Sequence, residues 1–203
     1  MDIMAKKPQS ASLGQIRIIG GKWRGRKLPV RDSEGLRPTT DRIKETLFNW
    51  LMPIVREARC LDCFAGSGAL GFEALSRFAD SVTFIELDKK NVQLLSENKV
   101  RLQANNANII NGNSLEVLNK LGTPFDVVFI DPPFRKGLLN ETIRLLEKNQ
   151  WLANESWIYV ESEAESPLTD IPANWQLHRE KIAGQVAYRL FIRHSIEETS
   201  HAN

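Results

Sequence analysis

The stretch that most constrains the fold of this chain is residues 60–71, which read CLDCFAGSGALG. An apolar run leads into this stretch, and its glycines, Gly66, Gly68 and Gly71, are followed by a helix-like pattern. This arrangement is typical of a β-strand, a tight turn and the N-terminus of a helix that cradles part of a nucleotide-like ligand. The stretch therefore predicts an α/β fold with a ligand site at the carboxyl end of a strand.

The rest of the chain predicts that this unit belongs to a larger sheet. Apolar runs predict parallel strands at residues 59–64, 81–87, 107–111, 125–130 and 157–161. Helical patterns separate them, at residues 69–77, 91–103, 114–121 and 138–148. Two alternating runs, 175–181 and 185–193, predict a C-terminal β-hairpin. Together these elements predict an α/β fold with a seven-stranded, mostly parallel sheet.

Length and composition indicate one domain with a small extension. The chain has 203 residues, of which 42% are apolar and 26% charged, as in ordinary soluble domains. We expect disordered tails at residues 1–13 and 195–203, an N-terminal basic extension at 14–52 and the main domain at 53–194. No apolar run approaches the roughly 18 residues of a membrane span, and the polar N-terminus is no secretory signal. We expect a cytoplasmic monomer.

The N-terminal extension is basic. Residues 1–59 hold 13 Lys and Arg against 6 Asp and Glu, a net charge of +7, whereas the remainder holds 14 against 19, a net charge of −5. Residues 15–30 alternate apolar and basic side chains around Gly20-Gly21, which predicts a β-hairpin with a glycine turn. A helix capped within residues 39–41 then runs to Pro53.

Basic residues around an aromatic side chain favour contact with nucleic acid. The alternative is that residues 15–30 form a solvated β-ribbon whose tryptophan, Trp23, packs onto the main domain. The predicted RNA-binding residues lie in the ribbon and at the start of the following helix: Arg17, Lys22, Trp23, Arg24, Arg26, Lys27, Arg37 and Arg42.

Residues farther along the chain are expected to complete the ligand site at the glycine stretch. Glu86 lies 20 residues after Gly66, at the end of the next predicted strand, as in sites where a carboxylate holds ribose hydroxyls. Asp62 would repel a pyrophosphate but would orient an ammonium group, which favours S-adenosylmethionine over a dinucleotide. The predicted cofactor-binding residues are Asp62, Phe64, Gly66, Ser67, Gly68, Glu86, Leu87, Asn113 and Ser114, the last two at the adenine edge unless they form an ordinary loop.

The motif Asp131-Pro132-Pro133-Phe134 follows the predicted strand at residues 125–130. In open α/β sheets ligands bind outside the carboxyl ends of the strands, so this motif faces the same crevice as the glycines. The prolines remove N–H donors and leave carbonyl acceptors, while Phe134 offers a flat face to a base. A carboxylate without a partner here is better explained by an NH2-bearing planar ring than by a stiff turn. We predict Asp131, Pro132 and Phe134 as catalytic residues.

Cys60 and Cys63 form a CxxC pair, but no second pair exists and the three histidines lie far away in sequence. On a strand, residues three apart point to opposite faces. We therefore expect two buried, reduced cysteines and no metal site.

The motifs together resemble those of the bacterial RsmD family, over residues 15–193. The resemblance is carried by IRIIGGKWRGRKLPV, RPTTDRIKETLFNWL, LDCFAGSGALGFEALSR, FIELD, DPPF and EKIAGQVAYRLF. It implies a class I, Rossmann-like fold with S-adenosylmethionine as methyl donor. It also implies methylation of a guanine N2 amine in small-subunit ribosomal RNA, with the base flipped into the DPPF pocket. We expect this RNA within an assembling particle, and naked RNA is the alternative.

The residues alone leave alternatives open. DPPF also permits adenine N6 or cytosine N4 as the methyl acceptor, in RNA or DNA. The glycine motif by itself is also compatible with an NAD-dependent oxidoreductase, and the basic ribbon with an RNA-binding protein that is not an enzyme.

Overall fold

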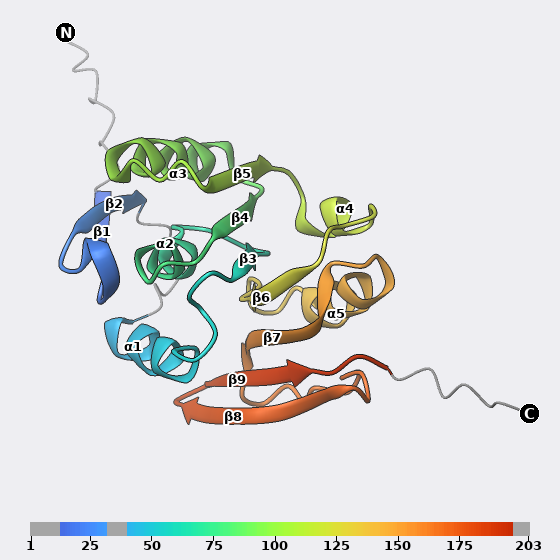
Figure 1. Cartoon of the computed structure of the whole chain (residues 1–203). Helices are drawn as coiled ribbons and strands as arrows, with labels where there is room; N and C mark the ends of the chain where they lie inside the picture. Colours follow the sequence, from blue (N-terminus) through green and yellow to red (C-terminus); the bar gives the residue numbers. More distant parts are fainter. Residues whose placement is uncertain (1–12, 32–39, 197–203) are drawn as a thin grey trace, which may run out of the picture.

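A seven-stranded sheet forms the centre of the protein (Figure 1). The computed structural model describes residues 13–31 and 40–196. The strands of this sheet are β3 (Arg59–Asp62), β4 (Ser81–Glu86), β5 (Ala107–Asn111), β6 (Phe125–Ile130), β7 (Leu152–Glu163), β8 (Trp175–Ala183) and β9 (Val186–Arg193). They lie in the order β5-β4-β3-β6-β7-β9-β8, with β3 to β7 parallel and β9 and β8 antiparallel. The predicted sheet and C-terminal hairpin are confirmed.

Helices follow each of the first four of these strands. They are α2 (Ala69–Ser76), α3 (Lys89–Leu102), α4 (Ser114–Leu118) and α5 (Leu138–Lys148). A further helix, α1 (Asp41–Trp50), precedes the sheet; Thr40 caps it by accepting from the Ile43 N–H at 3.4 Å. It ends before Pro53, as its sequence predicts.

The sheet has one apolar core on each face. Alternate residues of β6 divide between them: Val127 and Phe129 pack on one side, and Val128 and Ile130 on the other. The first core also contains buried residues of α1, α2 and α3, and the second those of α4 and α5. The helices therefore form a layer on each face and leave the carboxyl ends of the strands accessible.

The N-terminal ribbon consists of β1 (Leu13–Arg17) and β2 (Lys27–Arg31), which pair antiparallel. Its apolar residues belong to the first core, beside α2 and α3: Ile16, Ile18, Leu28 and Val30. The predicted hairpin is confirmed, whereas the division of the chain at residues 52/53 stays a prediction. The predicted RNA-binding residue Arg37 lies outside the described residues, as do most residues of the predicted disordered tails.

Gly20-Gly21 was predicted to form the hairpin turn, and this prediction is wrong. The strands are joined by a longer loop that contains the short 3-10 helix η1 (Gly21–Trp23). The glycines are needed because the loop lies against the end of α2: a Cβ on Gly21 would come within 1.9 Å of the Ser76 carbonyl oxygen. Ser76 Oγ also donates to the Gly20 carbonyl at 2.6 Å and accepts from the Trp23 N–H at 3.0 Å.

Candidate functional site

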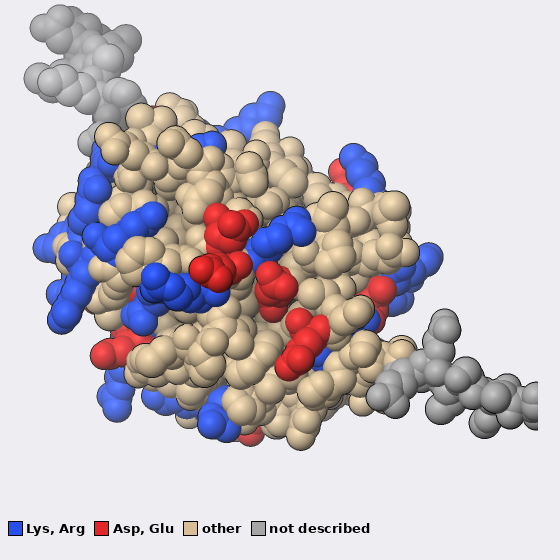
Figure 2. All heavy atoms as spheres, viewed as in Figure 1, with Lys and Arg blue, Asp and Glu red and all other residues tan. Residues whose placement is uncertain are grey.

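Four acidic side chains stand at the carboxyl ends of four neighbouring strands. Glu86 ends β4 and Asp62 ends β3, Asp131 follows β6, and Glu161 lies near the end of β7. The order of these strands in the sheet is β4-β3-β6-β7, so the carboxyl groups form a row across it. Figure 2, viewed as in Figure 1, shows acidic side chains near the middle of the visible surface and basic ones at its left, over β1 and β2. The structure thus brings together the predicted Asp62, Glu86 and Asp131.

The glycine loop is tied to the end of β4. The Gly66 N–H donates to Glu86 Oε2 at 2.6 Å, and Glu86 Oε1 accepts from the Asp88 N–H at 2.9 Å. The 20-residue spacing that predicts a ribose-binding carboxylate therefore places Glu86 directly against the loop. The contact fixes the orientation of this carboxylate before any ligand binds.

The three glycines have different roles. Gly66 and Gly68 have positive φ angles, 53° and 78°, which favour glycine. A Cβ on Gly66 would meet no atom within 4 Å, so this position faces open space that a ligand can occupy. A Cβ on Gly68 would lie 2.6 Å from a Leu95 methyl group, and one on Gly71 would lie 2.1 Å from the Phe84 ring. These two glycines allow α2 to pack closely against its neighbours.

Asp62 is buried, with 2% of its surface exposed. Its desolvation and the charge of Glu86 raise its pKa to about 7, while the Gly71 and Phe64 backbone amides oppose the shift. The group is thus partly protonated near neutral pH, and a cation nearby would favour its ionised form.

The predicted adenine edge is held by hydrogen bonds within the protein. Asn113 Oδ1 caps α4 by accepting from the Leu115 N–H at 2.9 Å. Ser114 is buried, and its hydroxyl donates to the Cys63 carbonyl at 2.5 Å. The two side chains thereby fix the start of α4 against the end of β3. Leu87, beside Glu86, is 65% exposed and offers an apolar surface at this edge.

The DPPF segment lies at the same edge of the sheet. Asp131 was expected to have no partner, but its carboxyl group is hydrogen-bonded to that of Glu161. Desolvation, followed by the charges of Glu161 and Asp62, raises the Asp131 pKa well above its ordinary value. Pro132 is buried, whereas the Phe134 ring is 43% exposed and can stack on a planar group.

Sequence reasoning missed Glu161 because a single acid in a strand carries no motif. Its role becomes visible only from the strand order, which sets β7 beside β6.

The ribbon carries most of the predicted RNA-binding side chains at the surface. Arg17, Arg24, Arg26, Lys27 and Arg42 are exposed. Arg17 lies 3.8 Å from Asp41, and Arg26 donates to the Arg101 carbonyl at 3.1 Å. Lys22 is also exposed, and its ammonium lies 4.5 Å from the centre of the Trp23 ring, which packs partly against the first core.

The two ends of the ribbon differ in their distance from the site. The η1 end contacts the C-terminal end of α2, whereas Arg31 at the other end pairs with Asp88, next to Glu86, at 3.0 Å. The helix α2 has eight residues, a length of about 12 Å, and begins at the glycine loop. Arg31, which sequence reasoning missed, therefore lies at the end of the ribbon that is tied to the loop after Glu86.

The cysteines, metal-binding clusters and membrane-spanning helices are the other functional features to consider in the described residues. Cys60 and Cys63 are buried free thiols that pack in the cores on opposite faces of the sheet, as predicted. Across residues 13–31 and 40–196, no group of three or more His, Cys, Asp or Glu side chains is arranged to hold a metal ion. No helix in these residues is long and apolar enough to cross a membrane.

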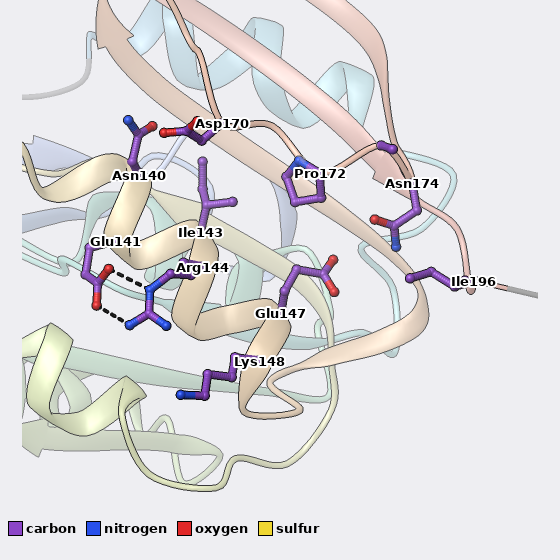
Figure 3. A pocket seen from close by; sticks show the side chains of 11 residues that line it. Asn140, Glu141, Ile143, Arg144, Glu147, Lys148, Asp170, Pro172, Asn174 and Ile196 are labelled. Carbon is purple, nitrogen blue, oxygen red and sulfur yellow. Dashed lines mark hydrogen bonds and ion pairs between the residues drawn. The ribbon is translucent and has the colours of Figure 1, made fainter.

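A hollow of about 910 Å³ lies between α5 and the segment that precedes β8 (Figure 3). Its polar lining includes the ion pair Glu141–Arg144 and Asp170. None of the predicted site residues lines it.

Comparisons with known proteins agree with this architecture. Ribosomal RNA small subunit methyltransferase D of Escherichia coli K12 is 62% identical over 96% of this chain and 98% of its own length. The protein of the same name from Haemophilus influenzae is 54% identical, covering 88% and 94%. A solved candidate methyltransferase from Escherichia coli superposes with a TM-score of 0.86 at 62% identity, over 90% of this chain and all of its own.

The fold is therefore that of the class I methyltransferases, as predicted. The family model described as Conserved hypothetical protein 95 matches residues 16–192, nearly the whole described chain. The chain belongs to this family, the RsmD family.

Proposed function

We propose that the protein transfers a methyl group from S-adenosylmethionine to the N2 amine of a guanine in small-subunit ribosomal RNA. Its relatives in Escherichia coli and Haemophilus influenzae are named as methyltransferases of that RNA. The observation that carries the proposal is the position of Asp131–Phe134, at the same sheet edge as the glycine loop and Glu86. We also propose that it acts as a cytoplasmic monomer on the RNA of an assembling subunit.

The residues present fit an adenosine ligand with a cationic tail. Gly66 faces open space, Glu86 is held in position for ribose hydroxyls, and Asp62 becomes ionised more readily beside a cation. A pyrophosphate at the glycine loop would instead meet the charge of Asp62, which disfavours a dinucleotide. When bound, S-adenosylmethionine supplies an electrophilic methyl group on a sulfonium.

The DPPF residues prepare the acceptor. The lone pair of an exocyclic amine is delocalised into its ring, so the nitrogen is a poor nucleophile. The two N–H groups of the amine donate hydrogen bonds to Asp131 and to the Pro132 carbonyl. These contacts favour a more pyramidal nitrogen whose lone pair points away from the two acceptors. Phe134 stacks on the base and offsets part of the few kcal/mol that flipping costs. Positioning alone lowers a barrier by roughly 7–11 kcal/mol in good cases, so direct in-line transfer needs no covalent enzyme intermediate.

The test is to methylate small-subunit RNA from a strain that lacks the protein, with labelled S-adenosylmethionine, and to identify the product nucleoside. We expect N2-methylguanosine at one position. N6-methyladenosine or N4-methylcytidine would keep the site but overturn the guanine assignment. Incorporation no higher than with heat-denatured protein would overturn the proposal.

Cofactor affinity should depend on the ionisation of Asp62. The folded-state pKa, about 7, lies above the ordinary value of 3.8, so Asp62 makes the free protein less stable as pH rises between these values. The ionised form pairs with the ligand ammonium, so affinity should rise by roughly tenfold between about pH 6 and pH 8.

Calorimetric titration of S-adenosylmethionine across this range measures the effect. Asp62→Asn is the control, because ionisation of the ligand itself contributes equally in both proteins. Parallel pH profiles for the two proteins would rule out the assigned role of Asp62.

Loss of ribbon charge should weaken RNA binding in a salt-dependent way. Arg24 and Lys27 are exposed on the ribbon, and Lys120 and Lys148 are exposed on the face covered by α4 and α5. Each phosphate contact contributes about 0.7 to the slope of log affinity against log salt for single strands. The double variant Arg24→Ala/Lys27→Ala should therefore lower the slope by about 1.4.

Filter binding of a small-subunit RNA fragment at several salt concentrations gives the slope. The variant Lys120→Ala/Lys148→Ala removes the same charge elsewhere and should leave the slope unchanged. Equal effects of both variants would indicate a general charge effect and no RNA contact by the ribbon.

A further inference from the structure

Glu161 is set beside Asp131 by the register of two strands. The parallel pairing of β6 and β7 ends with Ile130 opposite Val160, so Asp131 and Glu161 follow as the next pair. Neighbouring residues in this register point to the same face of a sheet. Glu161 is 9% exposed, and Asp131 is half-buried.

The two carboxyl groups lie within hydrogen-bonding reach of each other. Ionised carboxylates are acceptors only, so a hydrogen bond between the two groups requires one proton. The Tyr159 hydroxyl, itself buried, donates to Glu161 Oε2 at 3.1 Å and holds Glu161 from its other side. The contact therefore depends on a proton and is oriented by a fixed donor.

The surroundings favour retention of this proton. Asp62 faces the pair from β3, Tyr159 from β7 itself, and Tyr188 from β9, where it lies opposite Glu161. Within the described residues, no ion pair joins a Lys or Arg to either carboxyl group. Desolvation raises the pKa of both groups. Like charges without a cation favour one shared proton over two ionised groups.

We propose that Glu161 is a positioning residue that shares one proton with Asp131, orients its free oxygen toward the crevice and lets the pair accept the proton released by the methylated amine. The proposal rests on the catalytic role assigned to Asp131 above.

The proton balance is simple. Methyl transfer forms an N–C bond as the C–S bond of the sulfonium breaks with its electron pair left on sulfur, so the positive charge passes from sulfur to the amine nitrogen. One N–H bond then breaks, its electron pair stays on nitrogen, and the proton passes to the singly protonated pair. The pair becomes neutral and returns the proton to water before the next turnover.

The active form of the pair therefore carries one proton. At low pH a second proton binds to the pair, which then has no ionised oxygen to accept a proton. At high pH the last proton is lost, and repulsion between the two carboxylates displaces Asp131. We expect a kcat profile with both an acid and an alkaline limb. In Glu161→Gln the amide can donate to Asp131 without sharing a proton, so the alkaline limb should disappear.

Glu161→Ala should lower kcat by about 100-fold at neutral pH, and Glu161→Gln should recover part of this loss. Glu155→Gln, an exposed position on the same strand, is the matched control and should leave the whole profile unchanged. Thermal unfolding of each variant establishes that it is folded.

A second measurement needs neither substrate nor cofactor. Carboxyl carbon NMR of the free protein should show Asp131 and Glu161 titrating as a coupled pair, with one step well above the ordinary range. In Glu161→Gln, Asp131 should titrate at a lower pH. An unchanged Asp131 titration together with a wild-type pH profile would overturn the inference. Failure of the proposed function has a different signature, since the RNA would then take up no label even with the original protein, whereas the NMR titration would still report the pair.

Discussion

Asp131→Ala is expected to abolish methyl transfer while leaving the affinity for S-adenosylmethionine largely intact. The side chain lies at the end of β6, whereas the cofactor-binding residues are on β3, the glycine loop and the end of β4. Loss of its acceptor oxygen removes the contact that orients the amine and leaves Glu161 without its partner. We expect kcat to fall by more than roughly 10³-fold, which is about 4 kcal/mol of barrier.

Single-turnover methylation of the RNA and calorimetric titration of the cofactor separate the two effects. Asp131→Asn keeps an acceptor oxygen but no charge, so its activity should lie between that of the alanine variant and that of the original protein. Equal loss of turnover and of cofactor binding in Asp131→Ala would show that Asp131 supports the cofactor site instead of the acceptor.

Glu73→Ala should destabilise the protein by roughly 3–5 kcal/mol, the usual effect of removing one partner of a buried charge pair. Glu73 is fully buried on α2 and accepts from the Ile19 and Gly20 N–H groups at 3.0 and 2.9 Å. It also pairs with Arg77 at 2.9 Å and with Lys44, whose ammonium is 3.8 Å away and only 1% exposed. Burial lowers the pKa of Lys44, and the charge of Glu73 opposes this shift.

Urea unfolding measures the loss. The control is Glu141→Ala, which breaks the exposed Glu141–Arg144 pair on α5 and should have a much smaller effect on stability. Since Glu73 binds the backbone of the ribbon, Glu73→Ala should also expose residues 18–26 to proteolysis before the sheet unfolds. Similar stability losses in the two variants would mean that the buried cluster does not hold the ribbon.

Much of the fold follows from local patterns. β6 is a continuous apolar run and was predicted to the residue, as were β5 and α5. β7 begins at Leu152, five residues before its predicted start, because the polar segment there pairs with β6 across an irregularity in register. Such pairing is decided by the neighbouring strand and leaves no pattern of its own.

The site likewise contains residues that the sequence predicts and residues that only the structure reveals. The glycines and Glu86 carry a spacing that the sequence displays, and the structure places them in contact. Glu161 and Glu73 carry no such spacing, because their partners come from other elements of the fold. Gly20-Gly21 was misread since the same dipeptide serves a turn or a close approach, and only the position of Ser76 distinguishes them.

The row of acids also has a consequence for the order in which the protein becomes competent during synthesis. The four acids of the row are spread along the chain from Asp62 to Glu161. The strand β3, which is synthesised first, lies between β4 and β6 in the sheet. A nascent chain that ends before β7 can contain the glycine loop, Glu86 and DPPF, yet it lacks the partner of Asp131. Contacts between strands so distant along the chain form late. An incomplete chain can therefore hold its cofactor loop without yet possessing the pair that manages the proton.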